Sequence, residues 1–570
     1  MVGLLSSAPA LVAQQPATLR KYDVRFLTAR EAEMLPAQRT TPDVSTTDIP
    51  SSGAVLDPVA ALEPADLMAL LEQECEVASG NGAAQLEFTD SGILLVTADA
   101  KTHDRIAALV AQCRAYFLEQ VVLEMHVLPG SALAGGTGVL KRDEAEGLLS
   151  SSAPHPVFVC PARVGGSQVL QSNRDQAYVR DYDVEVAQGS NIPDPKVDVL
   201  RLGSGWQVRL EHGHDGRLLV QVHGDRAEQD ADPVPYPVRS RDVKNQEVIS
   251  LLQLSRTRIT QQWTQAMLGD GEALLWGSNS QPGAAWCLRV RRPKAVAPPS
   301  GIGWTMLPVR SLCVGLPEWG RFHFPVLASP GDDAPLVAEA QESPPRLLDK
   351  DKLMADLRQC LRGEASRSID YGAGVLIVRA PEPELQAVRE RLALLSADAA
   401  RDVSIEVRYG YLDANEVAVL LNPRTDMGEI AGRLHDACLT ASLLDGWFAC
   451  RVGKEASIVR DYDVEIAQDS SVPNPLIGTV FTGMTLRGQV LPVAEGQFRL
   501  ELDAGFAELD GAIEAFDTKD TRFGDIALPR LRNVHFDVAP IVEDNRWTLL
   551  HIASMPGNDQ HLVVVARVRE

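Results

Sequence analysis

Residues 179–195 read VRDYDVEVAQGSNIPDP, and residues 459–475 read VRDYDVEIAQDSSVPNP. The second stretch lies 280 positions after the first, and 12 of its 17 positions are identical. Chance does not supply a match of this length, so the chain contains an internal repeat. A repeat has to be found before other motifs are interpreted, because it sets the architecture that the motifs belong to.

The repeat extends in both directions from this stretch. Gly216 begins the segment GRLLV, and Gly496 begins GQFRL at the same spacing. Upstream, residues 92–96 (GILLV) correspond to residues 374–378 (GVLIV), with a spacing of 282. The small change in spacing indicates short loop insertions. The 570 residues are therefore predicted to be a tandem duplication of a unit of about 285 residues.

Each unit is predicted to contain a small α/β module. Pro64 opens a helix, residues 93–97 form an apolar strand, and residues 106–117 carry apolar side chains at helical spacing. A strand at residues 121–125 is predicted to complete the module, since a helix between two strands forms a compact α/β layer pair. The second copy repeats the helix at residues 385–395, after Pro381 and Pro383, and the last strand at residues 403–407.

A short strand and a long loop precede each module. The strands are predicted at residues 22–27 and 307–312. The segments that follow, residues 28–62 and 315–345, are rich in Pro, Ser, Thr and Asp and have no apolar period, which is typical of linkers.

The rest of each unit is predicted to be mostly β, which makes the fold class α+β. The evidence is alternation of apolar and polar residues between turn signals. It is visible at residues 179–187, 208–210, 218–222 and 498–502, with turns at residues 214–216 and 269–271.

Composition and motifs give no support to an enzyme or a nucleic-acid-binding protein. The chain has 54 basic and 77 acidic residues, a net charge of −23, and would repel phosphate backbones. Aromatic residues make up only 5%, which disfavours base stacking. The sequence contains no GxSxG, HExxH or Walker motif and no CxxC pair. We therefore expect neither a catalytic site nor a cofactor.

The repeated strand carries the candidate interface residues. In a strand of period 2, the acidic side chains point to one face and the arginine to the other. Three carboxylates on one face can pair with basic residues of a neighbouring strand or subunit, face water, or bind Ca²⁺. The candidate interface residues are Arg180, Asp181, Asp183 and Glu185 in the first copy, and Arg460, Asp461, Asp463 and Glu465 in the second.

Histidines offer a second, weaker alternative. His212, His214 and His223 lie near Asp215 at spacings that allow zinc binding, but a complete ligand set is not evident. The 280-offset positions of the second copy have no histidine, so no metal site is predicted.

The N-terminus and the cysteines bear on location. Residues 1–19 begin with an apolar run that ends in small residues, which is typical of a leader or signal remnant. The alternative is an N-terminal tail without such a role. Cysteines such as Cys113, Cys287 and Cys450 lie in apolar segments, where buried thiols are more common than reactive ones. The leader reading predicts an exported protein, in the periplasm or at the outer membrane.

The order of these parts resembles the secretin family of type II and type III secretion systems and type IV pili. Residues 92–128 (GILLVTADAKTHDRIAALVAQCRAYFLEQVVLEMHVL) and 374–412 are similar to a secretin N-domain, the ring-building periplasmic module. Residues 178–185 (YVRDYDVE), 475–483 (PLIGTVFTG) and 270–277 (DGEALLWG) look like parts of a secretin core. Two alternating copies of each part depart from the usual single core.

The resemblance implies a non-enzymatic, secretin-like envelope protein that acts by oligomerisation. Its expected partners are copies of itself, in a homo-oligomer or ring, and other secretion-system envelope proteins, with peripheral or outer-membrane association. The alternative is a periplasmic scaffold or binding protein that keeps the modules without a pore. The predicted parts are a leader at 1–19, a strand and linker at 20–62, an N-domain-like module at 63–130, a β-rich secretin-like module at 131–290, a linker with a strand at 291–345, a second N-domain-like module at 346–412 and a second β-rich module at 413–570.

Overall fold

The computed structural model has mixed α+β architecture, with most residues in strands of antiparallel sheets. It describes residues 17–28, 30–34, 55–60, 62–79, 84–89, 92–135, 138–152, 156–187, 190–213, 215–241, 247–278, 284–301, 303–313, 349–362, 367–372, 374–397, 401–420, 422, 425–443, 446–467, 470–519, 524–554 and 560–570. The proposed leader thus falls almost wholly outside the described residues. None of the helices within these ranges is long and apolar enough to cross a membrane.

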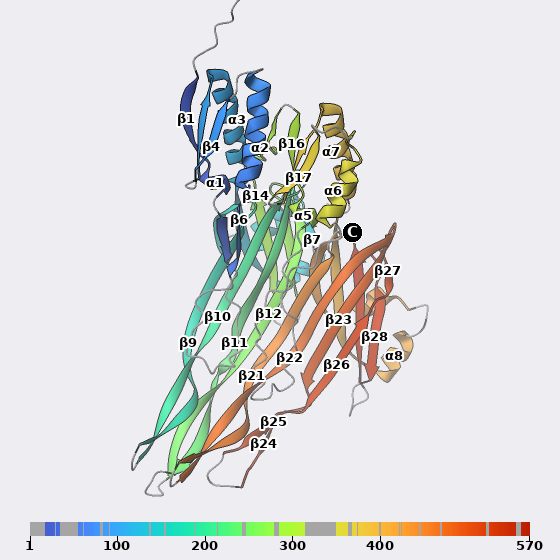
Figure 1. Ribbon diagram of the computed structural model, residues 1–570. Coiled ribbons are helices and arrows are strands. Elements are labelled where there is room, and N and C mark those ends of the chain that lie inside the picture. The colour runs from blue at the N-terminus through green and yellow to red at the C-terminus, as the bar shows by residue number, and fades with distance from the viewer. Residues whose placement is uncertain are drawn as a thin grey trace, which may run out of the picture.

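The larger of two main layers is a sheet of long strands, which we call the long sheet (Figure 1). Its strand order is β26-β23-β22-β21-β12-β11-β10-β9, and the short β27 also pairs with β23. The strands are β9 (Ser167–Ala187), β10 (Ser190–His212), β11 (Leu218–Arg241), β12 (Glu247–Leu268), β21 (Trp447–Ala467), β22 (Ser470–Ala494), β23 (Gln497–Leu509), β26 (Leu531–Val538) and β27 (Ile541–Glu543).

A second sheet, the short sheet, packs against the upper part of the long sheet. Its order is β28-β29-β19-β20-β13-β14-β6-β8, with β7 also paired to β13. The strands are β6 (Gln120–Pro129), β7 (Gly138–Leu140), β8 (Phe158–Arg163), β13 (Ala273–Ser278), β14 (Ala284–Arg291), β19 (Asp402–Asp413), β20 (His435–Ser442), β28 (Thr548–Ser554) and β29 (Gln560–Arg569).

The two sheets enclose two separate apolar cores, one in each half of the sandwich. In the first half, Trp206 of the long sheet packs among Trp276 and Trp286 of the short sheet, and all three side chains are buried. In the second half, Phe448 and Phe498 occupy the corresponding layer. Burial of such large side chains is the main stabilising term of each half.

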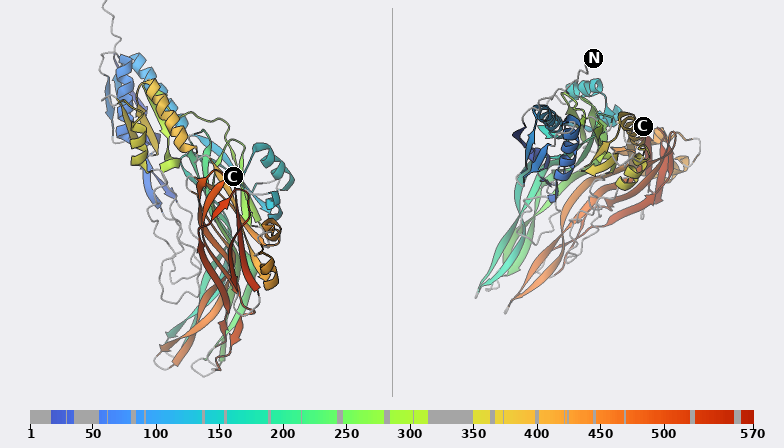
Figure 2. Two further views of the ribbon diagram at one scale, coloured as in Figure 1. Left: turned by 90° about the vertical axis from the view of Figure 1, so that its right-hand side faces the viewer. Right: turned by 45° about the horizontal axis from the view of Figure 1, so that its top comes forward.

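Helices cover the outer face of the short sheet and form a third layer (Figure 2). Leu149 of α4 packs on Leu275 and Cys287 in the first half, and Leu420 packs on Val563 and Val565 in the second. These elements are η1 (Gly130–Gly135), α4 (Arg142–Ser152), α8 (Ala414–Leu420) and α9 (Met427–Ala431). A separate two-stranded sheet joins β24 (Glu514–Phe516) to β25 (Ile526–Leu528) near the lower end of the long sheet (Figure 1).

Two small modules lie side by side above the sandwich (Figure 1). Module 1 consists of β1 (Thr18–Asp23), α1 (Arg25–Thr28), α2 (Pro64–Ser79), β4 (Gln85–Phe88), β5 (Ile93–Ala98) and α3 (Ala100–Phe117), with a nearby hairpin of β2 (Arg30–Met34) and β3 (Val55–Ala60). Module 2 consists of β15 (Ser300–Gly301), β16 (Trp304–Pro308), α5 (Arg310–Cys313), α6 (Lys350–Arg358), β17 (Ser368–Gly372), β18 (Val375–Arg379) and α7 (Glu382–Ser396).

The helices expected in these modules are present. Leu67, Leu70 and Leu71 of α2 are buried, as is the apolar stripe of α3. Asp99 caps α3 by accepting from the backbone N–H of Thr102 at 2.7 Å. Pro381 stands at the N-cap of α7, where its missing N–H costs no hydrogen bond.

Two details of the expected modules are wrong. The first strand lies earlier than residues 22–27, because β1 spans Thr18–Asp23 and the next residues turn into α1; in module 2, β16 likewise gives way to α5. The strand at residues 121–125 does not join β5. It lies in β6, between β14 and β8 of the short sheet, and residues 403–407 lie in β19 of the same sheet.

The long strands also exceed the short ones expected from alternation. β10 runs through Pro193 and Pro195, which are usually found only where a strand lacks a second neighbour. The register explains this, since residues 190–202 pair only with β9, and the ladder to β11 begins at Gly203. Pro473 and Pro475 lie in the same single-ladder part of β22.

Gly203 and Gly483 mark the point where each of these strands gains its second neighbour. Both have a positive φ, 121° and 147°, and their strand partners toward the second ladder are Ala227 and Ala507. A Cβ on Gly483 would come within 2.2 Å of the carbonyl oxygen of Val452. Only glycine accepts this conformation and this contact.

Candidate assembly interface

The junction between the two halves of the sandwich is an edge-to-edge strand pairing in both sheets, and we call it the seam. In the long sheet, β12 pairs with β21 from Arg256↔Ala456 to Trp263↔Ala449. In the short sheet, β13 pairs with β20 at Gly277↔Cys438 and Ser278↔Ala437. Both sheets therefore pass from one half to the next by the same kind of contact.

The strand β12 brings polar side chains into the seam. Gln262, Thr264 and Gln265 are all fully buried there, unlike the apolar residues that fill the cores on either side. Gln262 Nε2 lies 3.7 Å from Cys450 Sγ, as a donor to a weak sulfur acceptor. Ser255 and Ser457 bring their hydroxyl oxygens within 2.9 Å across the same ladder. These polar contacts distinguish the seam from the apolar cores on either side.

Thr264 ties the two sheets together at the seam. Its hydroxyl donates to the carbonyl oxygen of Thr440 at 2.7 Å and accepts from the Thr440 N–H at 3.1 Å. Thr440 belongs to β20 of the short sheet, so a single side chain satisfies the backbone of the facing layer. Buried backbone groups of this kind need such a partner.

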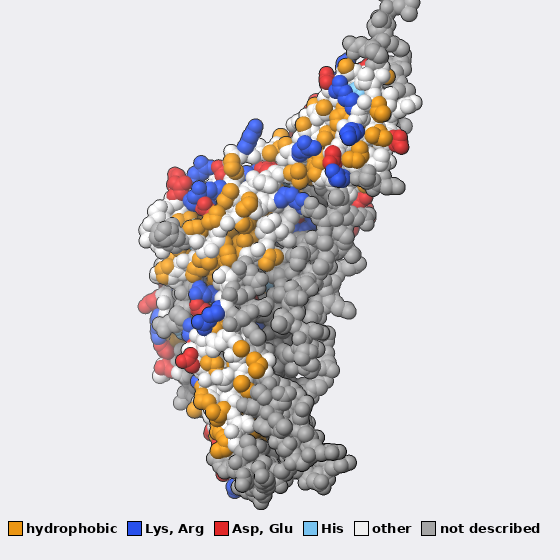
Figure 3. Space-filling model, turned by 90° about the vertical axis from the view of Figure 1, so that its left-hand side faces the viewer, with side chains coloured by type: hydrophobic (Ala, Val, Ile, Leu, Met, Phe, Trp, Pro, Cys, Tyr) orange, Lys and Arg blue, Asp and Glu red, His pale blue; other side chains and the backbone are white. Residues whose placement is uncertain are grey.

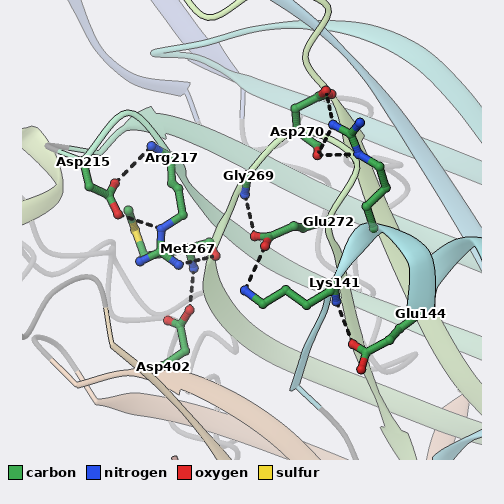
Figure 4. Close-up of polar contacts among 10 residues, drawn as sticks. Lys141, Glu144, Asp215, Arg217, Met267, Gly269, Asp270, Glu272 and Asp402 are labelled. Carbon is green, nitrogen blue, oxygen red and sulfur yellow. Dashed lines mark hydrogen bonds and ion pairs between the residues drawn. The ribbon is translucent and has the colours of Figure 1, made fainter.

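A buried carboxylate closes the upper end of the seam (Figure 4). Asp402 Oδ2 accepts from the backbone N–H of Met267 at 2.9 Å, which joins the start of β19 to the end of β12. Burial raises the pKa of Asp402 to about 7, opposed by the Met267 hydrogen bond and the charge of Arg217. Arg217 itself is held by Asp215 at 2.6 Å.

The turn after β12 is fixed by further charged contacts (Figure 4). Glu272 accepts from the N–H of Gly269 at 2.8 Å and pairs with Lys141 at 3.0 Å. Arg142, at the start of α4, pairs with Asp270 at 2.6 Å. These contacts hold the β12–β13 turn against the helical layer.

The lower end of the seam is charged. Asp230 of β11 receives Arg258 at 2.6 Å and Lys454 at 3.2 Å, so one carboxylate bridges the two halves. Arg451 pairs with Glu455 at 2.6 Å, and both side chains are buried. Burial raises the pKa of Glu455, although Arg451 opposes the shift.

Each half of the short sheet holds a glutamate–arginine ion pair between two adjacent strands. Glu124 of β6 accepts from Arg289 Nε at 2.7 Å, and Glu406 of β19 accepts from Arg567 Nη2 at 2.8 Å. The strand registers are the same, since Arg289↔Glu124 and Arg567↔Glu406 are direct partners.

A second pair of positions carries the same bridge with the charges exchanged. Arg292 Nε lies 2.5 Å from Glu119, and both side chains are buried. At the corresponding ends of the second half, Arg401 Nε lies 2.6 Å from Glu570. The two bridges have the same place at the end of the short sheet.

The acidic strand motif has a structural feature that alternation did not predict. The strand register skips Arg180 at a shift between Lys196 and Val197 and skips Arg460 at a shift between Val459 and Asp461, so both motifs contain a β-bulge. Asp461 is exposed, and its Oδ1 accepts from the N–H of Tyr462 at 2.8 Å.

The remaining motif residues lie in the lower hairpins, outside the β12–β21 ladder. Their strand partners are Asp181↔Lys196, Asp183↔Asp194, Glu185↔Ile192, Asp463↔Asn474 and Glu465↔Val472. Side-chain contacts of Asp181, Asp183, Glu185, Asp463 and Glu465 lie outside what the structure describes. Their role at an interface stays a prediction.

The histidine alternative finds different surroundings from those of a metal site. His212 stacks on Tyr116 with ring centroids 4.1 Å apart and lies 3.8 Å from Glu119. Burial lowers the pKa of His212 and of His223 to about 4. In the described part of the chain, no three His, Cys, Asp or Glu side chains form a metal-binding group. His214 is outside that part.

Sequence reasoning missed the seam, although a signal for it exists. Residues 260–265 read TQQWTQ, a polar run inside a strand that both neighbouring strands and the facing sheet bury. A polar run without apolar alternation in a central strand indicates a buried junction, because buried polar groups need hydrogen-bond partners. The partner strand β21, almost 200 residues away, has no comparable mark in its sequence.

No protein-family model and no curated protein matches the chain. Solved structures do match. They are secretins. Aeromonas hydrophila ExeD is 10% identical over 98% of this chain and 90% of that chain, with a TM-score of 0.19. The Klebsiella pneumoniae type II secretion system outer membrane complex of PulD, PulS and the PulC HR domain is 9% identical over 99% of this chain and 76% of that chain, with a TM-score of 0.18. The enterotoxigenic Escherichia coli pilotin–secretin complex AspS–GspD is 9% identical over 88% and 84%, with a TM-score of 0.19.

Proposed function

We propose that this chain is a structural, secretin-like component of a cell-envelope secretion or pilus machine that works as a homo-oligomer. The observation that carries the proposal is the seam. Two sandwich halves, each with its own apolar core, meet edge to edge through polar contacts such as that of Thr264 with Thr440. This is how subunits meet in an assembly whose sheets continue from one subunit to the next.

Tandem duplication is part of this proposal. Each sheet contains two runs of four strands, one from each half. In the long sheet β9-β10-β11-β12 is followed by β21-β22-β23-β26, and in the short sheet β8-β6-β14-β13 is followed by β20-β19-β29-β28. The matching bridges Glu124–Arg289 and Glu406–Arg567 support the same correspondence. On this view one chain supplies two adjacent positions of an assembly, each made of a module and a sandwich half.

The proposal assigns no chemistry to the chain. Among the described residues, buried Glu119 is engaged in a structural contact with Arg292. The proposed partners are copies of the chain and other envelope proteins of the same machine, at the periplasmic side of the outer membrane. Nucleic acid is not among them, because the net charge is −23.

Fractionation together with light scattering tests the proposal. We expect the tagged full chain in the envelope fraction, and a mass of several chains after gentle detergent extraction. A monomer in the periplasmic fraction would instead support the alternative, a scaffold or binding protein without assembly. Recovery of the folded protein from the cytoplasm would contradict both.

A further inference from the structure

We propose that the seam inside the chain is the template for the contact between chains, so that a second copy of this protein adds head to tail. The proposal rests on the proposed function and names the surfaces that carry it. One surface, the leading face, consists of β9, β8 and the open side of the β1–β5–β4 sheet. The other, the trailing face, consists of β26, β28 and helix α7.

The leading face exposes apolar residues at positions that the seam buries in the second half. Val159 of β8 is the strand partner of Glu124, and Cys438 of β20 is the strand partner of Glu406. The two glutamates correspond, because they form the ion pairs with Arg289 and Arg567 described above. Cys438 is buried next to Gly277 in the seam, whereas 57% of Val159 is exposed. An exposed valine in an edge strand is a cost unless another strand covers it.

The long sheet gives the same result. Val169 of β9 lies 280 positions before Ala449 of β21, the spacing of the repeated motif. Ala449 is buried against Trp263 of β12, whereas 42% of Val169 is exposed. Among the described strands, β9 is the edge of the long sheet and is 21 residues long, so its outward backbone groups form an extended template for a further strand.

The modules provide a third, independent match. Leu19 pairs with Thr97 in module 1, and Trp304 pairs with Arg379 in module 2, where Arg379 is 282 positions after Thr97. Trp304 is buried against module 1, and its Nε1–H donates to Glu74 of α2 at 2.5 Å. The corresponding Leu19 is 66% exposed.

Strands β1 and β9, which carry Leu19 and Val169, lie on the same side of the molecule (Figure 1). Figure 3 shows that side, where hydrophobic side chains extend from the small module down over the upper part of the sheets. Monomeric proteins seldom expose an apolar band of this kind, and such bands mark interaction surfaces.

The trailing face offers the complementary elements. Val538 of β26 pairs with Leu502 as Thr264 of β12 pairs with Val222, so β26 corresponds to the seam strand β12. Arg567 of β29 corresponds to Arg289 of β14. Counting along the strands from these two arginines, Ile552 of β28 corresponds to Gly277 of β13.

Helix α7 completes the trailing face. Leu394 corresponds to Gln112 of α3, whose side chain accepts from the Ser300 N–H between the modules at 3.4 Å. Leu394 is 66% exposed. Leu394 of α7 would therefore contact the open apolar side of module 1 in the next chain.

One occupant fits both faces, a second copy of the chain. Such a contact joins two different faces, so it is heterologous and repeats until a ring closes or a filament grows. Strand β26 would pair with β9 of the next copy, and β28 with β8.

Mixing two cysteine variants of the full chain tests this contact. The proposal pairs residue 159 of one chain with residue 552 of the next, so we expect a mixture of Val159→Cys and Ile552→Cys to give a disulfide-linked dimer on oxidation. Peptide mass spectrometry should identify the 159–552 link. Each variant alone and the wild type, which contain the native cysteines, set the background, and Val493→Cys mixed with Ile552→Cys is the matched control.

A second variant keeps the test sharp. Val159→Arg combined with Val169→Arg should reduce the mass from light scattering to that of one chain, with an unchanged circular dichroism spectrum. Val493→Arg, an equally exposed valine at the end of a central strand, should leave the mass unchanged. An oligomer that survives the double variant and shows no 159–552 link overturns the head-to-tail contact but leaves the proposed function standing. A wild-type monomer overturns both.

Discussion

Thr264 and Thr440 form a two-way hydrogen bond across the seam, in which one hydroxyl both donates to and accepts from the facing backbone. The two residues belong to different sheets and to different halves of the sandwich. The contact therefore joins the two sheets as well as the two halves.

We expect Thr264→Val to destabilise the chain. Valine matches the shape of threonine but leaves the N–H and C=O of Thr440 without their partner in a buried place. The cost of such groups is about 1–3 kcal/mol in the free energy of unfolding. Urea denaturation measures it, and Thr264→Ser, which keeps the hydroxyl, should recover most of the loss. Equal stability of the valine variant and the wild type would contradict the role given to this contact.

The pH dependence of stability should report Asp402. Burial raises its pKa to about 7 in the folded chain, so the folded chain binds this proton more tightly than the unfolded chain does. The contribution is complete below the ordinary aspartate range and is lost as the pH rises through 7. Asp402→Asn imitates the protonated form and keeps an oxygen for the Met267 N–H. It should raise the melting temperature more at pH 8 than at pH 5, and flatten the slope between them.

Trp304 should control how the two modules sit together. Trp304→Ala removes a buried ring between α2 and β16, at a cost of about 3–5 kcal/mol for truncation of a large aromatic. We expect faster proteolysis of module 2 while the sandwich stays protected. Trp304→Phe keeps one aromatic ring but loses part of the buried ring volume and the hydrogen bond to Glu74, so it should lie between alanine and wild type. Identical cleavage rates of all three proteins would contradict the packing role.

The parts of this fold that could be predicted from the sequence are those that depend on local patterns, and the parts that were missed depend on strand pairing between distant residues. Helices α2, α3 and α7 follow from apolar residues at helical spacing, which is a local signal. The length of β10 was hidden, because Pro193 and Pro195 are local strand breakers that only the one-sided ladder tolerates. Membership of β6 in the short sheet was missed, since strand pairing is a non-local property and adjacency in sequence favoured β5.

The polar junction of the seam was not predicted from the sequence, and the predicted interface residues remain a prediction. The resemblance to secretins implied self-association, and the motif at Arg180 and Arg460 drew attention to acidic strands. In the structure those arginines lie at β-bulges, and the polar junction contains Gln262 and Thr264 instead. A buried glutamine and an exposed one look the same in a sequence until the neighbouring strand is known.

The two charge-exchanged bridges allow a prediction about the short sheet. Glu119→Arg alone places a second positive charge beside the buried Arg292. Breaking a buried ion pair in this way costs about 3–5 kcal/mol in the free energy of unfolding. The double variant Glu119→Arg, Arg292→Glu recreates the arrangement that Arg401 and Glu570 hold in the second half. We therefore expect the double variant to be more stable than either single variant, by denaturant unfolding.

The recovery should be partial. Arg292 also donates to the carbonyl oxygen of Gly216, and a glutamate at that position cannot do so. Glu119→Gln, which removes the charge and keeps the shape, is the matched control and should fall between the wild type and Glu119→Arg. If the double variant is less stable than Glu119→Arg alone, the two ends of the short sheet do not provide equivalent surroundings, and the correspondence between the halves fails at this position.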